Sequence, residues 1–154
     1  MKPTSLAHFG RVPAVLVCTL ASLLVAPLAA GAGHEPFADI KVHKQSGIPY
    51  VSGGKDEAER KEMQRIANKY PMQLMFTQDG KPDGVSGVKV TVKDMKGDHV
   101  IEAVSDGPFF YFNPPSGRWT MDAEVEGQTV SRTVDLIGRR YIVLEFHFKG
   151  EGAQ

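Results

Sequence analysis

The chain is almost without cysteine. Its single cysteine, Cys18, lies inside an apolar stretch near the N-terminus, so cleavage after that stretch would leave a mature chain with none. Disulfide bonds, zinc–thiolate centres and cysteine nucleophiles are therefore excluded from the mature part. Net charge is also lacking, because 18 Lys and Arg residues balance 18 Asp and Glu residues. The sequence has no excess of basic residues, so no nucleic-acid partner is expected.

The N-terminal segment has the three parts of a secretory signal peptide. Lys2 and Arg11 precede an apolar run, and the small residues Ala30, Gly31 and Ala32 follow it as an A-x-A site. This order predicts a signal peptide over residues 1–32, cleaved after Ala32, and a periplasmic or secreted mature protein. No later stretch is apolar enough to cross a bilayer, so no membrane span is expected after signal removal.

The segment "KDEAERKEMQRIANKY", residues 55–70, has the pattern of one amphipathic helix. Asp56 suits the N-cap, and Glu59 stands three residues later as its capping-box partner. Pro71 ends the pattern. Apolar residues recur at helical spacing along one stripe, at Met63, Ile66, Ala67 and Tyr70. Because one helix cannot bury such a stripe alone, we expect it to lie on a sheet.

After Pro71 the apolar period changes to two, which is typical of strands. About seven short strands are expected, each bounded by Gly, Pro, Asp or Asn turns, over residues 72–77, 88–92, 99–105, 109–113, 119–125, 130–136 and 142–148. This pattern predicts a mainly β protein with an antiparallel, seven-stranded sandwich.

The segment before the sandwich is expected to hold little regular structure besides the helix. Residues 33–71 are predicted as a lead-in with one short strand at Ile40–His43, turn chemistry in "VSGG" at 51–54, and the helix. The sandwich is then assigned to residues 72–149, and residues 150–154 to a polar tail.

The segment "SDGPFFYFNPPSGRWTMDAEVEG", residues 105–127, contains five aromatic residues, three prolines and three glycines. Together with the alternating "VKVTV" at 88–92, it resembles the carboxypeptidase-regulatory-like domain, a transthyretin-like (prealbumin-like) β-sandwich. The resemblance rests on the ten-residue step from Gly107 to Gly117 and on Trp119, which stands where that family usually has tyrosine. Pro114 departs from the family pattern, where leucine is usual.

The mature chain is also similar to small secreted bacterial proteins that carry this domain. The shared features are the "YVSGG" lead at 50–54, the charged helix and the "SDGP" strand at 105–108. Both resemblances imply a fold and a compartment, and neither implies a reaction.

The resemblance also implies which aromatic side chains form the core. Phe109 and Tyr111 share one face of a strand, while Phe110 and Phe112 share the other. By analogy with the family, Phe109 and Tyr111 are expected to face inward beside Trp119. Phe110 and Phe112 then face outward, where either the helix or the lead-in covers them or they form an exposed binding surface.

Catalytic and metal-binding motifs are missing from the sequence. It has no G-x-S-x-G and no H-E-x-x-H, and its candidate metal ligands, His43, His99 and His147, are scattered. Several methionines would suit Cu(I), but Met63, Met72 and Met121 fall on expected core faces. No cofactor is predicted.

These observations favour a non-catalytic module that binds a protein or a cell-envelope component. The alternative is a periplasmic protein that binds a small ligand or a copper-type metal. A transthyretin-like hydrolase comes third, because the C-terminal Y-R-G-S of those enzymes is replaced by "FHFKGEGAQ".

Overall fold

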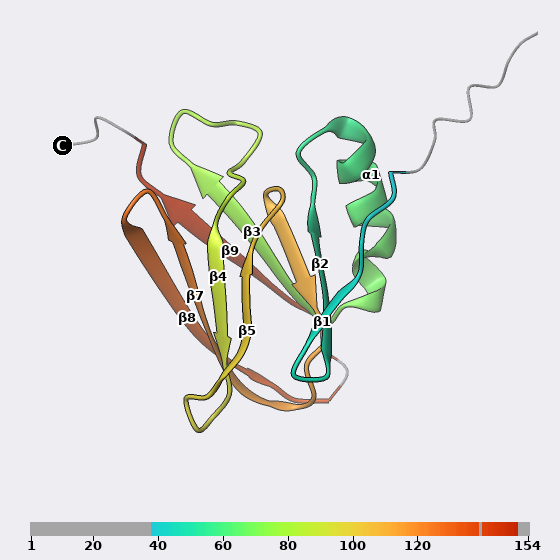
Figure 1. The fold of residues 1–154 in the computed structure, drawn as a ribbon, viewed down its shortest axis with the longest axis vertical. Helices are drawn as coiled ribbons and strands as arrows, with labels where there is room; N and C mark the ends of the chain where they lie inside the picture. Colours follow the sequence, from blue (N-terminus) through green and yellow to red (C-terminus); the bar gives the residue numbers. More distant parts are fainter. Residues whose placement is uncertain (1–37, 139, 151–154) are drawn as a thin grey trace, which may run out of the picture. The chain divides into compact units, whose positions relative to one another are not determined.

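The computed structural model describes residues 38–138 and 140–150, which form two β-sheets and one short helix (Figure 1). The chain divides into two units, Met1–Gly33 and His34–Gln154, and every described residue belongs to the second. The predicted signal peptide and its cleavage after Ala32 lie outside the described residues. Within them, no helix is both long and apolar enough to cross a membrane.

Sheet A has five strands and sheet B has four. In spatial order, sheet A contains β1 (His43–Gln45), β2 (Ile48–Gly53), β6 (Phe109–Phe112), β3 (Met72–Gln78) and β9 (Ile142–Phe148). Sheet B contains β5 (His99–Val104), β4 (Lys89–Lys93), β7 (Gly117–Val125) and β8 (Gln128–Leu136). All pairings are antiparallel except that of β3 with β9, which is parallel.

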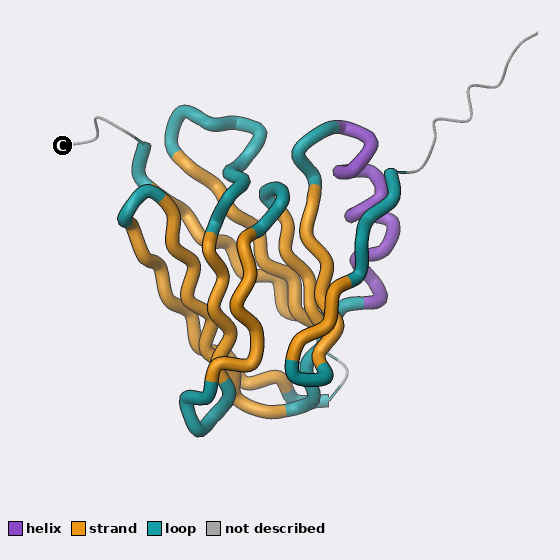
Figure 2. Tube along the Cα trace, viewed as in Figure 1, coloured by secondary structure: helices purple, strands orange, loops and turns teal. Residues whose placement is uncertain are grey.

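The two sheets face one another in a sandwich-like arrangement and share one core (Figure 2). The alternating pattern of β3 turns Met72, Leu74 and Phe76 toward sheet B, and Phe146 of β9 packs beside Phe76 with ring centroids 5.8 Å apart. From sheet B, Trp119 and Met121 of β7 enter the same core. These side chains are fully or almost fully buried, and their removal from water stabilises the fold.

The helix α1 (Glu57–Ile66) confirms the cap predicted from the sequence. The Asp56 carboxylate accepts a hydrogen bond of 2.8 Å from the Glu59 backbone N–H. The Glu59 carboxylate in turn accepts from the N–H groups of Gly54 and Lys55. A short 3₁₀ segment, Ala67–Lys69, continues α1 and ends before Pro71.

A second, smaller core lies between α1 and the outer face of sheet A. Met63, Ile66 and Tyr70 of the helical segment pack there against Val51 of β2 and Tyr111 of β6. Sheet A is therefore buried on both faces where the helix covers it (Figure 1).

This double burial overturns the predicted orientation of the aromatic strand. Phe110 and Phe112 point into the sandwich core that contains Trp119, and both are 0% exposed. Tyr111 points the other way, to the helix, with Phe109 packed beside it. Because β6 lies between β2 and β3 and has a core on each side, its sequence is apolar at every position and does not reveal which pair faces the sandwich.

The segment assigned to the lead-in contributes two strands to sheet A. Residues 51–53, predicted as a turn, form the end of β2, and Tyr50 and Gly53 are paired with Phe112 and Phe109. The first strand is His43–Gln45 rather than Ile40–His43. The described residues thus contain nine strands instead of seven, and a boundary at residue 71 does not separate the sandwich from what precedes it.

A glutamine side chain bridges the two sheets at each open edge. The Gln45 carboxamide donates to Glu102 O at 3.0 Å and accepts from Glu102 N at 2.8 Å. The Gln128 carboxamide makes the same pair of bonds to Lys149, at 2.8 and 2.9 Å. Because a carboxamide carries one donor and one acceptor group like a peptide unit, each bridge imitates one step of strand pairing.

Candidate functional site

The sandwich has two ends that differ in how they are built (Figure 1). The closed end is where β2, β3, β5, β7 and β9 finish, and it consists of residues 52–56, 79–87, 105–108, 126–127 and 149–150. The loop end is where β1, β4, β6 and β8 finish and β3 begins, and it consists of residues 46–47, 68–71, 94–98, 113–116, 137–138 and 140–141.

At the closed end, two glycine-containing motifs pack directly against each other. A methyl group on Gly107 would lie 2.3 Å from the carbonyl oxygen of Gly53, and one on Gly54 would lie 2.4 Å from the ring of Phe109. Gly54 also has a φ of +94°, which side chains disfavour. The "VSGG" and "SDGP" segments are therefore two halves of one close backbone contact.

The polar groups of the closed end bond to one another. The Asp106 N–H donates to Ser52 Oγ at 3.1 Å, and that hydroxyl lies 3.2 Å from the Asp106 carboxylate, to which it donates. The Ser105 hydroxyl accepts from the Val88 N–H at 3.1 Å. These bonds are internal, but the closed end also has a hollow of about 240 Å³, and Arg60 is among the residues that line it.

The loop end contains a hollow of about 200 Å³ with polar side chains and apolar walls. Its walls include Pro71, Pro114 and Leu136. Four polar side chains also line it, and none of the four hydrogen-bonds to another described residue: Asn68, Lys69, Asn113 and Ser116. All four belong to exposed residues. Polar groups beside apolar walls are typical of binding sites. We call this the polar hollow.

Two contacts hold the polar hollow in shape. The Tyr141 hydroxyl donates to Asn68 O at 2.8 Å, which ties the β8–β9 connection to the end of the helical segment. Trp119 Nε1 donates to Pro115 O at 3.0 Å and so fixes the β6–β7 connection to the core. The predicted core residue Trp119 therefore also positions a wall of the candidate site.

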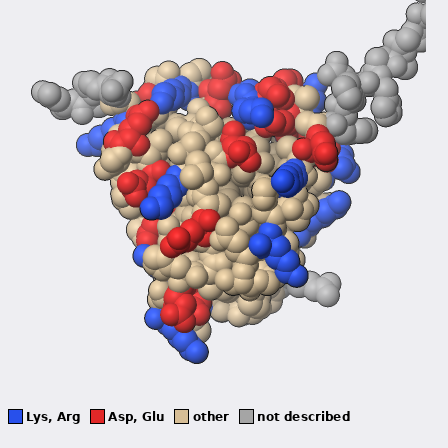
Figure 3. All heavy atoms as spheres, viewed as in Figure 1, with Lys and Arg blue, Asp and Glu red and all other residues tan. Residues whose placement is uncertain are grey.

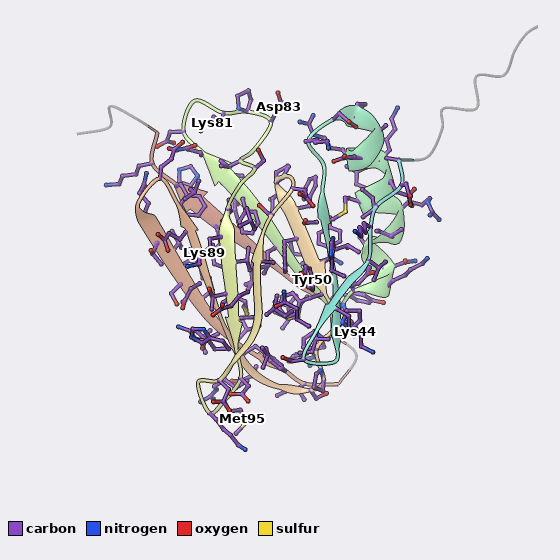
Figure 4. All side chains as sticks on the ribbon, in the orientation of Figure 1. Lys44, Tyr50, Lys81, Asp83, Lys89 and Met95 are labelled. Atoms are coloured by element: carbon purple, nitrogen blue, oxygen red, sulfur yellow. The ribbon has the colours of Figure 1, made fainter. Side chains whose placement is uncertain are left out.

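A second, wider hollow of about 570 Å³ adjoins the first and shares Ser116 and Leu136 with it. Met95 and Ile137 line this apolar hollow, and they are 76% and 72% exposed. Figure 4 shows Met95 at the tip of the β4–β5 turn, pointing away from the sandwich. Covering two such side chains would remove apolar area from water and stabilise a complex.

The charges around the loop end are mixed. Arg118 and Asp135 stand in the wall of the apolar hollow and form a two-bond ion pair at 2.8 and 3.1 Å. The hydrogen bond from Arg118 lowers the pKa of the Asp135 carboxyl, so Asp135 stays ionised at neutral pH. Figure 3 shows positive and negative side chains interspersed over the visible face, without a patch of one sign.

The three candidate metal ligands each contact different residues. The His43 ring stacks on Tyr50 at 5.3 Å, and His99 Nδ1 contacts a Glu102 carboxylate oxygen. His147 lies between Thr77 and Asp79. Over residues 38–138 and 140–150, no three His, Cys, Asp or Glu side chains form a group that could hold a metal ion.

The contacts of His147 form a hydrogen-bonded chain on the outer face of sheet A. Its Nε2 lies 3.1 Å from Asp79 Oδ1, and its Nδ1 lies 3.1 Å from Thr77 Oγ1. The Thr77 hydroxyl also lies 2.8 Å from the Glu145 carboxylate. Since this hydroxyl has one proton, it donates either to the carboxylate or to the imidazole. The chain joins residues 68 to 70 positions apart, so no local motif could have revealed it.

The binding residues predicted from the sequence do not lie at either hollow. Phe110 and Phe112 are core residues and offer no surface to a partner. The exposed residues Met95 and Ile137 were missed, although each is an apolar residue inside a turn-forming sequence, "DMKGD" and "LIGRR". An apolar residue in such a turn cannot reach the core, so the sequence could have predicted that Met95 and Ile137 are exposed.

Comparisons with known proteins assign no family. The chain matches no protein-family model, and a search of curated proteins finds no matching sequence.

Proposed function

We propose that this chain is a secreted or periplasmic, non-catalytic β-sandwich module of transthyretin-like type that binds a protein or cell-envelope component through its loop end. The observation that carries the proposal is the exposure of Met95 and Ile137 beside two adjoining hollows. Covering these two side chains would contribute about 1.5 to 3 kcal/mol each if both became fully buried.

The construction of the sandwich supports the loop end as the binding surface. At the closed end, Ser52 and Asp106 bond to each other and Gly107 has no room for added atoms, and none of the exposed large hydrophobic side chains of the described residues lines the hollow of about 240 Å³ there. The loop end keeps polar side chains without partners among the described residues and apolar side chains without cover. A rigid sandwich that presents loops at one end is a common way to build a binding surface.

Site-specific photo-crosslinking in cells that secrete the chain tests this proposal. The probe replaces Lys96 in the β4–β5 turn of the loop end or, as the matched control, Lys81 in the β3–β4 connection of the closed end. Both lysines are exposed. We expect a discrete heavier adduct from position 96 and none from position 81. No adduct at 96, or equal adducts at both positions, would contradict the proposal.

The alternative function is the binding of a small ligand, and the polar hollow favours it. Its volume of about 200 Å³ and its four polar side chains, which make no hydrogen bond to another described residue, would suit a small polar molecule. In that case the Lys96 probe would give no protein adduct, and ligand extracted from the purified chain would be detected by mass spectrometry.

A further inference from the structure

We infer that the loop end recognises the carboxyl terminus of a peptide. The terminal carboxylate lies in the polar hollow, and the preceding apolar side chains cover Met95 and Ile137. This inference rests on the proposed function and names the chemistry of its partner.

The side chains of the polar hollow match a carboxylate. Lys69 brings an ammonium group, Asn68 and Asn113 bring amide N–H donors, and Ser116 brings a hydroxyl. No Asp or Glu is among the described lining residues. The ammonium group of Lys69 is attracted to the Glu62 carboxylate, which is itself bonded to Arg65. Hydrogen bonds from such donors to an ionised acceptor are stronger than those between neutral groups. Capture of a terminal carboxylate is an established way of recognising peptides.

The sizes of the two hollows fit one chain end followed by an apolar segment. The polar hollow, of about 200 Å³, has room for a terminal residue. A chain leaving it past Ser116 and Leu136 enters the apolar hollow directly, because both residues line both hollows. There the ion pair of Arg118 with Asp135 leaves no unpaired charge facing apolar side chains.

The test uses two pools of randomised, N-acetylated hexapeptides, one with free carboxyl termini and one amidated. Each pool is passed over the purified chain, and retained peptides are identified by mass spectrometry. We expect retention from the free-acid pool to exceed that from the amidated pool by about tenfold, with apolar residues preferred at the last positions. Retention from neither pool, or equal retention from both, would overturn the inference.

Two matched variants locate the interaction. Lys69→Met keeps most of the side-chain length, removes the ammonium group, and is expected to reduce free-acid retention about tenfold. Lys81→Met at the closed end is expected to leave retention unchanged, and circular dichroism of both variants confirms that they are folded. Equal retention by Lys69→Met and the unmodified chain would also overturn the inference.

The inference and the proposed function fail in different ways. If the amidated pool binds as well as the free-acid pool while the Lys96 probe still captures a partner, the carboxylate assignment is wrong and the interaction module stands. If the probe captures nothing while free-acid peptides are retained, the peptide site is correct and the cellular partner is not a protein reached from position 96. Failure of both experiments would reject both ideas.

Discussion

At the closed end of the sandwich, backbone packs on backbone and polar groups bond to each other. At the loop end, exposed apolar side chains lie beside polar side chains that have no hydrogen-bond partner among the described residues. The two ends come from the same strands, so the difference lies in the connections. The closed end uses glycine to bring segments into contact, as at Gly53 and Gly107. The loop end instead places Met95 and Ile137 in its turns. Under the proposed function, the closed end maintains the fold and the loop end binds the partner.

The largest expected effect comes from filling the backbone contact at the closed end. Gly107→Ala would place a methyl carbon 2.3 Å from the Gly53 carbonyl oxygen, and neither backbone segment can move aside cheaply. We expect the free energy of unfolding to fall by about 3 kcal/mol or more. Denaturant titration of the purified variant measures this.

The control for that substitution is Gly97→Ala at the loop end. Gly97 has a φ of +84°, and an added methyl group would meet no atom within 4 Å. Only backbone strain is introduced, with an expected loss of about 1 to 2 kcal/mol. If the two alanine variants were equally destabilised, the closed end would not be the tighter of the two.

A pair of serine substitutions compares the hydrogen bonding of the two ends. Ser52→Ala leaves the Asp106 N–H without its acceptor in a half-buried site, and we expect a loss of about 1 to 2 kcal/mol in unfolding free energy. Ser116→Ala at the loop end removes no hydrogen bond to a described residue, and a change within about 0.5 kcal/mol is expected. Thermal unfolding of both variants measures these losses of stability. A larger loss for Ser116→Ala than for Ser52→Ala would contradict the view that the closed end is the more tightly bonded.

A smaller effect is expected from lowering the pH, through the protonation of Glu126 at the closed end. Glu126 accepts hydrogen bonds from Gln78, at 2.8 Å, and from Lys81, and these bonds lower its pKa. A carboxyl whose pKa is lower in the folded state stabilises that state above its unfolded pKa, near about 4.3, and loses this contribution as pH falls through the folded pKa. We expect unfolding free energy to decrease less steeply in Glu126→Gln than in the unmodified chain between about pH 5 and pH 3. An identical dependence of unfolding free energy on pH in the two proteins would mean that Glu126 does not stabilise the closed end.

Much of the fold could be predicted from local pattern. The capped helix with its stripe of Met63, Ile66 and Tyr70 is confirmed, as are the alternating strands that begin near Met72 and Trp119. Strand β2 was missed because Gly53 and Gly54 favour turns, and its pairing with β6 depends on residues about sixty positions away. The pairing of β3 with its parallel partner β9 was also missed, because paired residues of these strands are 70 positions apart.

The candidate site was less predictable than the fold. Alternation shows that Phe110 and Phe112 share a face, but it cannot show that both faces of β6 are buried, because the second cover is the helix. The resemblance to the carboxypeptidase-regulatory-like domain led to the wrong pair being placed inward. The sequence also could not show that Met95 and Ile137 lie beside the two hollows, because these hollows form only where separate connections meet at one end of the sandwich.

The most direct test of the whole account is the double variant Met95→Ser with Ile137→Ser, carrying the photo-crosslinking probe at position 96. If the loop end binds a partner and does not support the fold, unfolding free energy stays within about 0.5 kcal/mol of the unsubstituted chain and the adduct is lost. A large loss of stability would show that these side chains belong to the fold. An undiminished adduct at unchanged stability would show that the partner does not use them.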